Sequence, residues 1–148
     1  MIRRPPRSTL SSSSAASDVY KRQALDYSLE RKQFSKPIAG YQLTQSKFAE
    51  MITQITMAQL TVYQLGRLKD QNKMRFDQVS LAKRNNCSMA RDVARTCREI
   101  LGGNGIMEDY SPMRHMTNIE TVFTYEGTHE MHSLILGQSV TGIAAYDS

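Results

Sequence analysis

Two long helical patterns constrain the fold of this 148-residue chain more than any other feature. Between residues 40 and 69, apolar side chains recur every three or four positions, which places them on one face of an α-helix. A second pattern with the same period covers residues 78–101. Amphipathic helices of this length need partners that cover their apolar faces. The two stripes consist of Phe48, Met51, Ile52, Ile55, Ala58, Val62 and Leu65, and of Ala82, Met89, Val93, Cys97 and Ile100.

Shorter segments extend this helical reading to most of the chain. Residues 24–34 are typical of the end of a helix, which Pro37 stops. Ser111 followed by Pro112 predicts the start of a short helix, and residues 128–145 predict a final one. Strand-like alternation is weak and confined to residues 121–124. We therefore expect an all-α, up-and-down helical bundle. The inward positions of the final helix are Met131, Leu134, Ile135 and Ile143.

The first twenty-three residues differ from the rest in composition. They are rich in Arg and Ser and show no apolar face, which indicates a disordered tail. A mitochondrial transit peptide has a similar composition but needs an amphipathic stripe, which this segment lacks. Residues 13–23 resemble instead a translated transposase adapter for sequencing libraries, whose last six codons would be GAT GTG TAT AAG AGA CAG. We predict that residues 1–23 are not native and that the bundle comprises residues 24–148.

The charge of the chain resides largely in that leader. The whole sequence has 19 Lys and Arg and 14 Asp and Glu, a net charge of +5. Residues 1–23 hold 5 of the basic and 1 of the acidic residues, which leaves 14 against 13. Residues 24–148 therefore lack the basic excess of a nucleic-acid-binding domain. No apolar run approaches the length of a membrane span, so no membrane association is expected.

Cysteine placement favours a reducing compartment. Cys87 and Cys97 lie in the same predicted helix, about 15 Å apart by helical rise. That separation is too large for a disulfide bond.

A cluster of glycines follows the second long pattern, at Gly102, Gly103 and Gly105. A dinucleotide-binding fingerprint would follow a strand and open a helix, whereas this cluster closes a helix. The plain interpretation is a left-handed helix cap and a turn. The functional interpretation is that the uncovered backbone N–H groups face a phosphate.

Glu126 and the nearby histidines form a second candidate site. Glu126 precedes Gly127 immediately before the final helix, where an acid is favoured by the helix dipole alone. A carboxylate beside a glycine at such a junction is also able to approach a flat ligand closely. His129 and His132 are three residues apart, one short of the zinc-helix spacing, and a second Glu-x-x-His unit for a di-iron site is absent from the sequence. We therefore expect no metal site.

Several segments, taken in order, resemble the carboxy-terminal domain of acyl-CoA dehydrogenases. The resemblance covers essentially all of residues 24–146, and the ending, from Leu134 to Ile143, is similar to the glutaryl-CoA branch. The segments are Glu30-Arg31-Lys32-Gln33-Phe34 with Lys36-Pro37-Ile38, Lys83-Arg84-Asn85-Asn86, Leu101-Gly102-Gly103-Asn104-Gly105-Ile106, and Tyr125-Glu126-Gly127-Thr128-His129.

The resemblance implies a flavoenzyme of three domains, of which this chain holds the last, without the amino-terminal helical and middle β domains. Such enzymes oxidise acyl-CoA thioesters with FAD and pass electrons to an electron-transfer flavoprotein. They assemble as homotetramers whose flavin sites span subunits. The glutaryl branch converts glutaryl-CoA to crotonyl-CoA with loss of carbon dioxide. The expected location is the bacterial cytoplasm, or the mitochondrial matrix in a eukaryote.

The same resemblance assigns roles residue by residue. Glu126 is the base that removes the α-proton, while Tyr125 and Gly127 contact the substrate. Arg31 matches a contact to the FAD diphosphate. The remaining expected FAD contacts are Gln42, the run Glu99, Ile100, Leu101, Gly102 and Gly103, and Thr128, His129 and Glu130 on the flavin side.

Two positions depart from the family pattern, and two other functions stay open. Glu99 stands where many members carry Gln, and Gln138 stands where the glutaryl branch carries Arg. The alternative functions are a related FAD enzyme, dehydrogenase or oxidase, acting on another short acyl-CoA, and a non-catalytic helical interaction module. We expect the fragment alone to be inactive, because Glu126 without flavin has no hydride acceptor.

Overall fold

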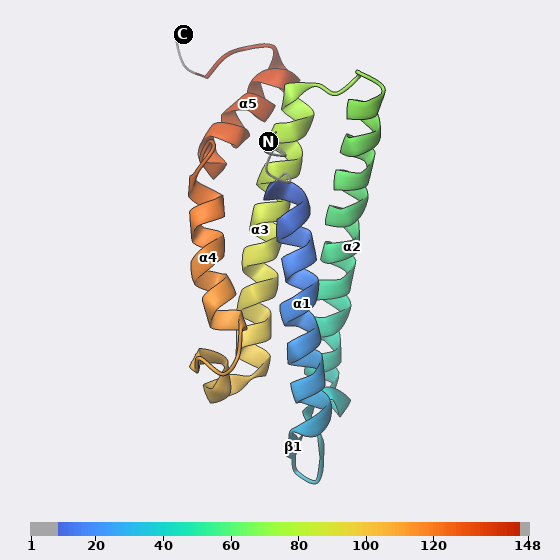
Figure 1. The fold of residues 1–148 in the computed structure, drawn as a ribbon, viewed down its shortest axis with the longest axis vertical. Coiled ribbons are helices and arrows are strands. Elements are labelled where there is room, and N and C mark those ends of the chain that lie inside the picture. Colours follow the sequence, from blue (N-terminus) through green and yellow to red (C-terminus); the bar gives the residue numbers. More distant parts are fainter. Residues whose placement is uncertain (1–8, 146–148) are drawn as a thin grey trace, which may run out of the picture.

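The computed structural model describes residues 9–145, and the side chains of residues 17–145, as a helical bundle (Figure 1). Its elements in chain order are α1 (Thr9–Glu30), β1 (Lys32–Gln33), β2 (Lys36–Pro37), the 3₁₀ helix η1 (Ile38–Gly40), α2 (Gln42–Asp70), α3 (Phe76–Ile100), the 3₁₀ helix η2 (Gly102–Ile106), α4 (Pro112–Thr124) and α5 (His129–Thr141).

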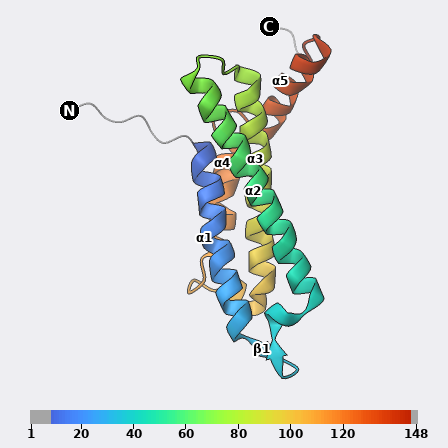
Figure 2. The ribbon, with the colours of Figure 1, turned by 90° about the vertical axis from the view of Figure 1, so that its right-hand side faces the viewer.

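The first four helices alternate in direction along the long axis of the molecule, as Figures 1 and 2 show. Helix α3 is central and packs against α1, α2, α4 and α5. Helix α5 continues in the direction of α4 after a short loop, so it prolongs that side of the bundle (Figure 1). The expected all-α, up-and-down bundle is confirmed for α1 to α4. None of the helices within residues 9–145 is long and apolar enough to cross a membrane.

The stripe predicted on α3 forms the centre of the core. Ala82, Met89, Val93, Cys97 and Ile100 are all buried, as their spacing indicated. The stripe predicted on α2 is confirmed only in part. Its buried members are Met51, Ile55 and Ala58, whereas Ile52 is 47% exposed. Helix α2, with 29 residues, packs against the bundle along one side only. The face that it buries is therefore narrower than the predicted stripe.

Helix α1 contradicts the expected disorder for residues 9–23. It begins at Thr9, and its residues Ser17, Tyr20, Ala24 and Ser28 are buried at helical spacing. The hydroxyl of Tyr20 donates a hydrogen bond of 3.0 Å to the carbonyl of Ala90 in α3. Serine and alanine do not register as an apolar stripe in a sequence, yet small side chains allow two helices to approach closely. Residues 1–8 lie outside the described residues, and the adapter origin of the segment stays a prediction.

A tight hairpin, which the sequence did not predict, follows α1. The expected helix 24–34 ends at Glu30, and β1 pairs antiparallel with β2 in the register Lys32 to Pro37 and Gln33 to Lys36. Phe34 and Ser35 form its turn with φ values of 47° and 69°. These left-handed conformations give no signal in a sequence without glycine or asparagine at the turn.

Four smaller features concern the carboxy-terminal half and the thiols. Residues 121–124, read weakly as strand, are the last turn of α4. Helix α5 ends at Thr141, short of residue 145, because Gly142 adopts a left-handed φ of 73°. Met131 and Ile143 were expected to face inward and are 38% and 74% exposed.

Both cysteines are buried free thiols, so the prediction of no disulfide is confirmed.

Candidate functional site

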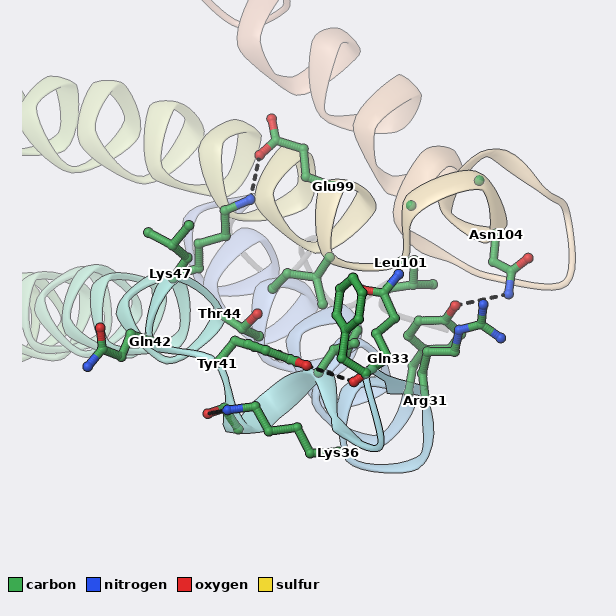
Figure 3. Close-up of a pocket in the computed structure, with 18 residues that line it drawn as sticks. Arg31, Gln33, Lys36, Tyr41, Gln42, Thr44, Lys47, Glu99, Leu101 and Asn104 are labelled. Atoms are coloured by element: carbon green, nitrogen blue, oxygen red, sulfur yellow. Dashed lines mark hydrogen bonds and ion pairs between the residues drawn. The ribbon is translucent and has the colours of Figure 1, made fainter.

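A groove lies at the end of the bundle where the hairpin meets the end of α3 (Figure 3). It encloses about 1040 Å³ between α1, the hairpin, the start of α2 and the turn after α3. Seven of the residues expected to contact FAD line it: Arg31, Gln42, Glu99, Ile100, Leu101, Gly102 and Gly103. The structure thus brings together residues that lie up to 72 positions apart in the chain.

The groove carries a positive charge that is only partly balanced. Arg31, Lys36 and Lys47 line it together with a single carboxylate, Glu99. Nζ of Lys47 donates a hydrogen bond of 3.1 Å to Glu99, and two arginines of α3 lie within 4.0 Å of the same carboxylate. Glu99 stands where many family members carry Gln, and its negative charge would repel an anionic ligand. The neighbouring Lys and Arg side chains offset that charge. The groove suits an anionic ligand.

Other polar contacts shape the groove without filling it. The hydroxyl of Tyr41 donates a 2.7 Å hydrogen bond to the Gln33 carbonyl and ties α2 to the hairpin. Asn104 donates a 3.2 Å hydrogen bond to the hydroxyl of Tyr27 and ties η2 to α1. Ile100 and Leu101 point into the core, with exposed fractions of 9% and 2%. Any ligand in the groove therefore meets the backbone of these two residues more than their side chains.

Within the glycine cluster, the fold requires glycine at Gly102 and Gly105 but not at Gly103. Gly102 adopts a left-handed φ of 59°, as a helix cap demands. A Cβ atom on Gly105 would lie 2.2 Å from the carbonyl oxygen of Arg98. Gly103 differs, because a Cβ atom there would meet nothing within 4 Å and its φ is ordinary. Its bare backbone faces the groove, which is where a ligand would approach.

The second set of predicted residues forms the loop between α4 and α5. Glu126 and Gly127 both adopt left-handed conformations, with φ values of 54° and 91°. A non-glycine residue in that conformation is strained, and such strain is often found at functional sites. Glu126 is exposed and Tyr125 is 39% exposed. The hydroxyl of Thr128 caps α5 by accepting a hydrogen bond of 3.3 Å from the backbone of Met131.

The ionisable side chains of the first turn of α5 are perturbed by their surroundings. The ring of His129 stacks on Phe123 with centroids 4.5 Å apart, and the guanidinium of Arg91 covers the same phenyl ring at 4.1 Å. Partial burial, and then Arg84, lower the pKa of His129. The backbone at the helix start and the Thr128 hydroxyl lower the pKa of Glu130. Within the described residues, no three His, Cys, Asp or Glu side chains could hold a metal ion.

The two sets of residues do not meet within one chain. Helix α4, with 13 residues, separates the glycine cluster from Glu126 by about 20 Å of helical rise. Among the described residues, the lining of the groove includes none of residues 125–130.

One buried residue beside the loop carried no role in the sequence interpretation. Lys83 is 6% exposed, and its Nζ donates hydrogen bonds to the carbonyl oxygens of Tyr125, Glu126 and Gly127. The sequence did hold a signal for it. Lys83 lies on the same helical face as Ala90 and Cys97, and a lysine within a buried stripe needs a dedicated partner.

The fold and these two sets of residues define a carboxy-terminal domain of a flavoenzyme family. The family description "Acyl-CoA dehydrogenase, C-terminal domain" matches residues 10–141, and this chain belongs to that family.

Individual relatives agree with this assignment. A crystal structure of glutaryl-CoA dehydrogenase from Mycobacterium smegmatis superposes with a TM-score of 0.91 at 44% identity, over 93% of this chain and 36% of that one. A structure of a glutaryl-CoA dehydrogenase from the same organism in complex with FADH2 is 43% identical and has the same TM-score and coverage. A short-chain specific acyl-CoA dehydrogenase of Megasphaera elsdenii is 34% identical over 114 residues, 77% of this chain and 30% of the relative. The chain thus spans about a third of the length of its relatives.

Proposed function

We propose that this chain is the carboxy-terminal domain of an FAD-dependent acyl-CoA dehydrogenase that oxidises and decarboxylates glutaryl-CoA to crotonyl-CoA. One observation carries the proposal. Glu126 is presented on a strained two-residue turn, and that turn is fixed from beneath by a buried lysine. A carboxylate that is exposed on a strained backbone is suited to act as a base toward a bound substrate.

The groove fits the FAD that this function requires. Arg31 presents a planar guanidinium fork, which matches the oxygens of a diphosphate. At Gly103 no atom of the described residues lies within 4 Å of where a Cβ atom would stand, which leaves room for a ligand. Lys36 also lines the groove and adds positive charge, whereas Lys47 is paired with Glu99. These residues, with Gln42 and Glu99, would hold the diphosphate and adenosine end of the cofactor.

The chemistry assigned to Glu126 is the removal of the proton on the α-carbon of the thioester. That proton is weakly acidic, so the base has to be placed accurately and kept from water when the substrate is bound. FAD, when bound, supplies the acceptor for the hydride that leaves the β-carbon. Tyr125 and Gly127 flank Glu126 and would contact the thioester. Thr128, His129 and Glu130 would lie on the flavin side, at the start of α5.

The choice of glutaryl-CoA rests on the relative that is 44% identical and on the ending of α5. In that reaction the oxidised product loses its terminal carboxylate as carbon dioxide. The electron pair of the broken bond stays on the remaining carbon chain, and the protonated Glu126 returns a proton to it. Gln138 is the one residue of this region that departs from the expected pattern, and it is exposed near the end of α5.

We also propose a homotetramer and an electron-transfer flavoprotein as partners of the complete enzyme. The groove and Glu126 lie in separate parts of one chain, as expected where each flavin site spans subunits. Met57, Leu60 and Tyr63 on the outer face of α2 are 59%, 61% and 66% exposed. Apolar side chains of this size suit burial against another domain or another copy.

The test uses a completed enzyme, in which this chain from Ala24 onward is joined to the preceding part of the glutaryl-CoA dehydrogenase from Mycobacterium smegmatis. It should bind FAD and turn over glutaryl-CoA, and Glu126→Gln should abolish turnover while FAD stays bound. Glu108→Gln, at an exposed carboxylate outside both sets of predicted site residues, tests whether the loss belongs to Glu126 or to any carboxylate of the chain. Faster turnover with butyryl-CoA than with glutaryl-CoA would contradict the substrate. Turnover that survives Glu126→Gln would contradict the role of the base.

A further inference from the structure

Lys83 stands out among the charged residues of the bundle because its side chain is buried. It lies on the inner face of α3, and only 6% of its surface is exposed. Placing an ammonium group away from water is costly unless acceptors replace the lost hydration. An apolar residue would fill this position on α3 more simply. The presence of a lysine at this buried position therefore indicates that its hydrogen bonds stabilise a particular part of the structure.

The acceptors of Lys83 are three consecutive backbone carbonyls of the α4–α5 loop. Nζ lies 2.6 Å from the carbonyl oxygen of Gly127 and 3.2 Å from that of Glu126, and it also donates to the carbonyl of Tyr125. Successive carbonyls of an extended chain point in alternating directions. Here they converge because residues 126 and 127 are both left-handed. An ammonium group has three donors, so the loop uses its full capacity.

Side chains of α5 and α3 also border the loop. The ring of His132, from α5, packs against Gly127 on the side away from solvent. Burial, and then the nearby Lys83, lower the pKa of His132, so a charged ring is disfavoured beside the ammonium. Arg84, the next residue of α3, donates a 2.8 Å hydrogen bond to Ser133 and fixes α5 itself. The Lys83 ammonium also lies over the ring of Tyr125, with Nζ 5.6 Å from the ring centroid.

We infer that Lys83 is a positioning residue, whose ammonium group holds residues 125–127 in the left-handed turn that presents Glu126. The assignment of Glu126 as the base rests on the proposed function, whereas the effect of Lys83 on the conformation of the loop does not. Lys83 itself touches neither substrate nor cofactor in this account. It acts through the backbone beneath Glu126.

The first test measures loop order in the chain itself. Lys83→Met keeps the volume of the side chain and removes all three donors. Amide hydrogen exchange should accelerate roughly tenfold or more at residues 125–129, while the exchange of core amides in α2 and α3 stays the same. Arg84→Met, which alters the adjacent residue, should leave residues 125–127 protected. Unchanged exchange at the loop would overturn the inference, and so would equal acceleration throughout the chain, which would assign Lys83 to general stability.

The second test uses the completed enzyme and separates this inference from the proposed function. Lys83→Met should lower kcat by roughly tenfold to a hundredfold, with KM and FAD content little changed, because a misplaced base affects the transition state more than binding. Lys83→Arg should restore part of that loss. Wild-type kcat in Lys83→Met would overturn the inference. If Glu126→Gln retains turnover, the proposed function fails, while the exchange result of the first test stands or falls by itself.

Discussion

The Nε2 atom of His132 lies 3.0 Å from the point where a Cβ atom on Gly127 would stand. Gly127 also has a φ of 91°, a conformation that side chains rarely adopt. The buried ring of α5 and the turn that carries Glu126 are therefore fitted to each other, and only glycine satisfies both conditions.

Gly127→Ala should destabilise the chain by about 1–3 kcal/mol, because the left-handed backbone is strained and the imidazole of His132 has to move. Gly66→Ala is the matched control. It lies within α2, a Cβ atom there meets nothing within 4 Å, and alanine should stabilise the helix by about 0.5–1 kcal/mol. Urea unfolding of both variants measures the difference. Equal stabilities would show that the turn relaxes around the added methyl group.

Gly103 and Gly105 should respond differently to the same substitution. Gly105→Ala should destabilise the chain by about 1–3 kcal/mol, since its methyl group would press on the carbonyl of Arg98. Gly103→Ala should leave the free energy of unfolding unchanged but weaken FAD binding in the completed enzyme, because its methyl group projects into the groove. Thermal unfolding and FAD titration measure the two effects. Full FAD affinity in Gly103→Ala would remove Gly103 from the cofactor site.

Tyr20 tests whether the adapter-like segment is part of the core. Tyr20→Phe removes the hydroxyl that donates to the Ala90 carbonyl and contacts Ser17 at 2.6 Å, and should cost about 1 kcal/mol of stability. Tyr63→Phe is the control, because Tyr63 is 66% exposed on α2. Chemical unfolding measures both. If the two variants are equally stable, residues 17–23 do not pack as described.

The hydrogen bonds of Asp77, at the start of α3, predict that the stability of the chain depends on pH. Its carboxylate accepts hydrogen bonds of 2.7 Å from Arg75 and from Ser139 of α5, and these partners lower its pKa below the ordinary value of 3.8. A lowered pKa in the folded state means that the stabilisation is present above the unfolded pKa and is lost as the pH falls through the folded one. Asp77→Asn should therefore lower Tm at pH 7, and the difference should shrink below about pH 4. Asp109→Asn, at an exposed carboxylate, should show no comparable change at either pH.

The predictable part of the fold was the part with strong periodicity. Four helices pack against α3, and each predicted position of its stripe is buried. The helix start at Pro112 and the left-handed cap at Gly102 follow from local chemistry that a sequence displays directly. The missed elements depend on contacts between distant residues. The packing of α1 uses serines, which carry no apolar signal, and the hairpin places Phe34 and Ser35 in left-handed conformations without glycine.

The candidate site was likewise predictable only in part. Arg31, Gln42 and the run from Glu99 to Gly103 were expected to act together, and the structure gathers them in one groove. Lys47 was missed because its role is to neutralise Glu99, 52 positions away. The place of Lys83 on the buried face of α3 was a signal in the sequence, but its partners could not be predicted, because they are backbone carbonyls that any residue type supplies. The roles of the individual residues stay predictions.

The most direct test of the central claim is the anaerobic reaction of the completed enzyme with one equivalent of glutaryl-CoA, followed by flavin absorbance. We expect the wild-type flavin to bleach rapidly and Glu126→Gln to slow bleaching by at least about 10³-fold while it binds FAD and glutaryl-CoA normally. Bleaching of the Glu126→Gln flavin at the wild-type rate would contradict the assignment of Glu126 as the base.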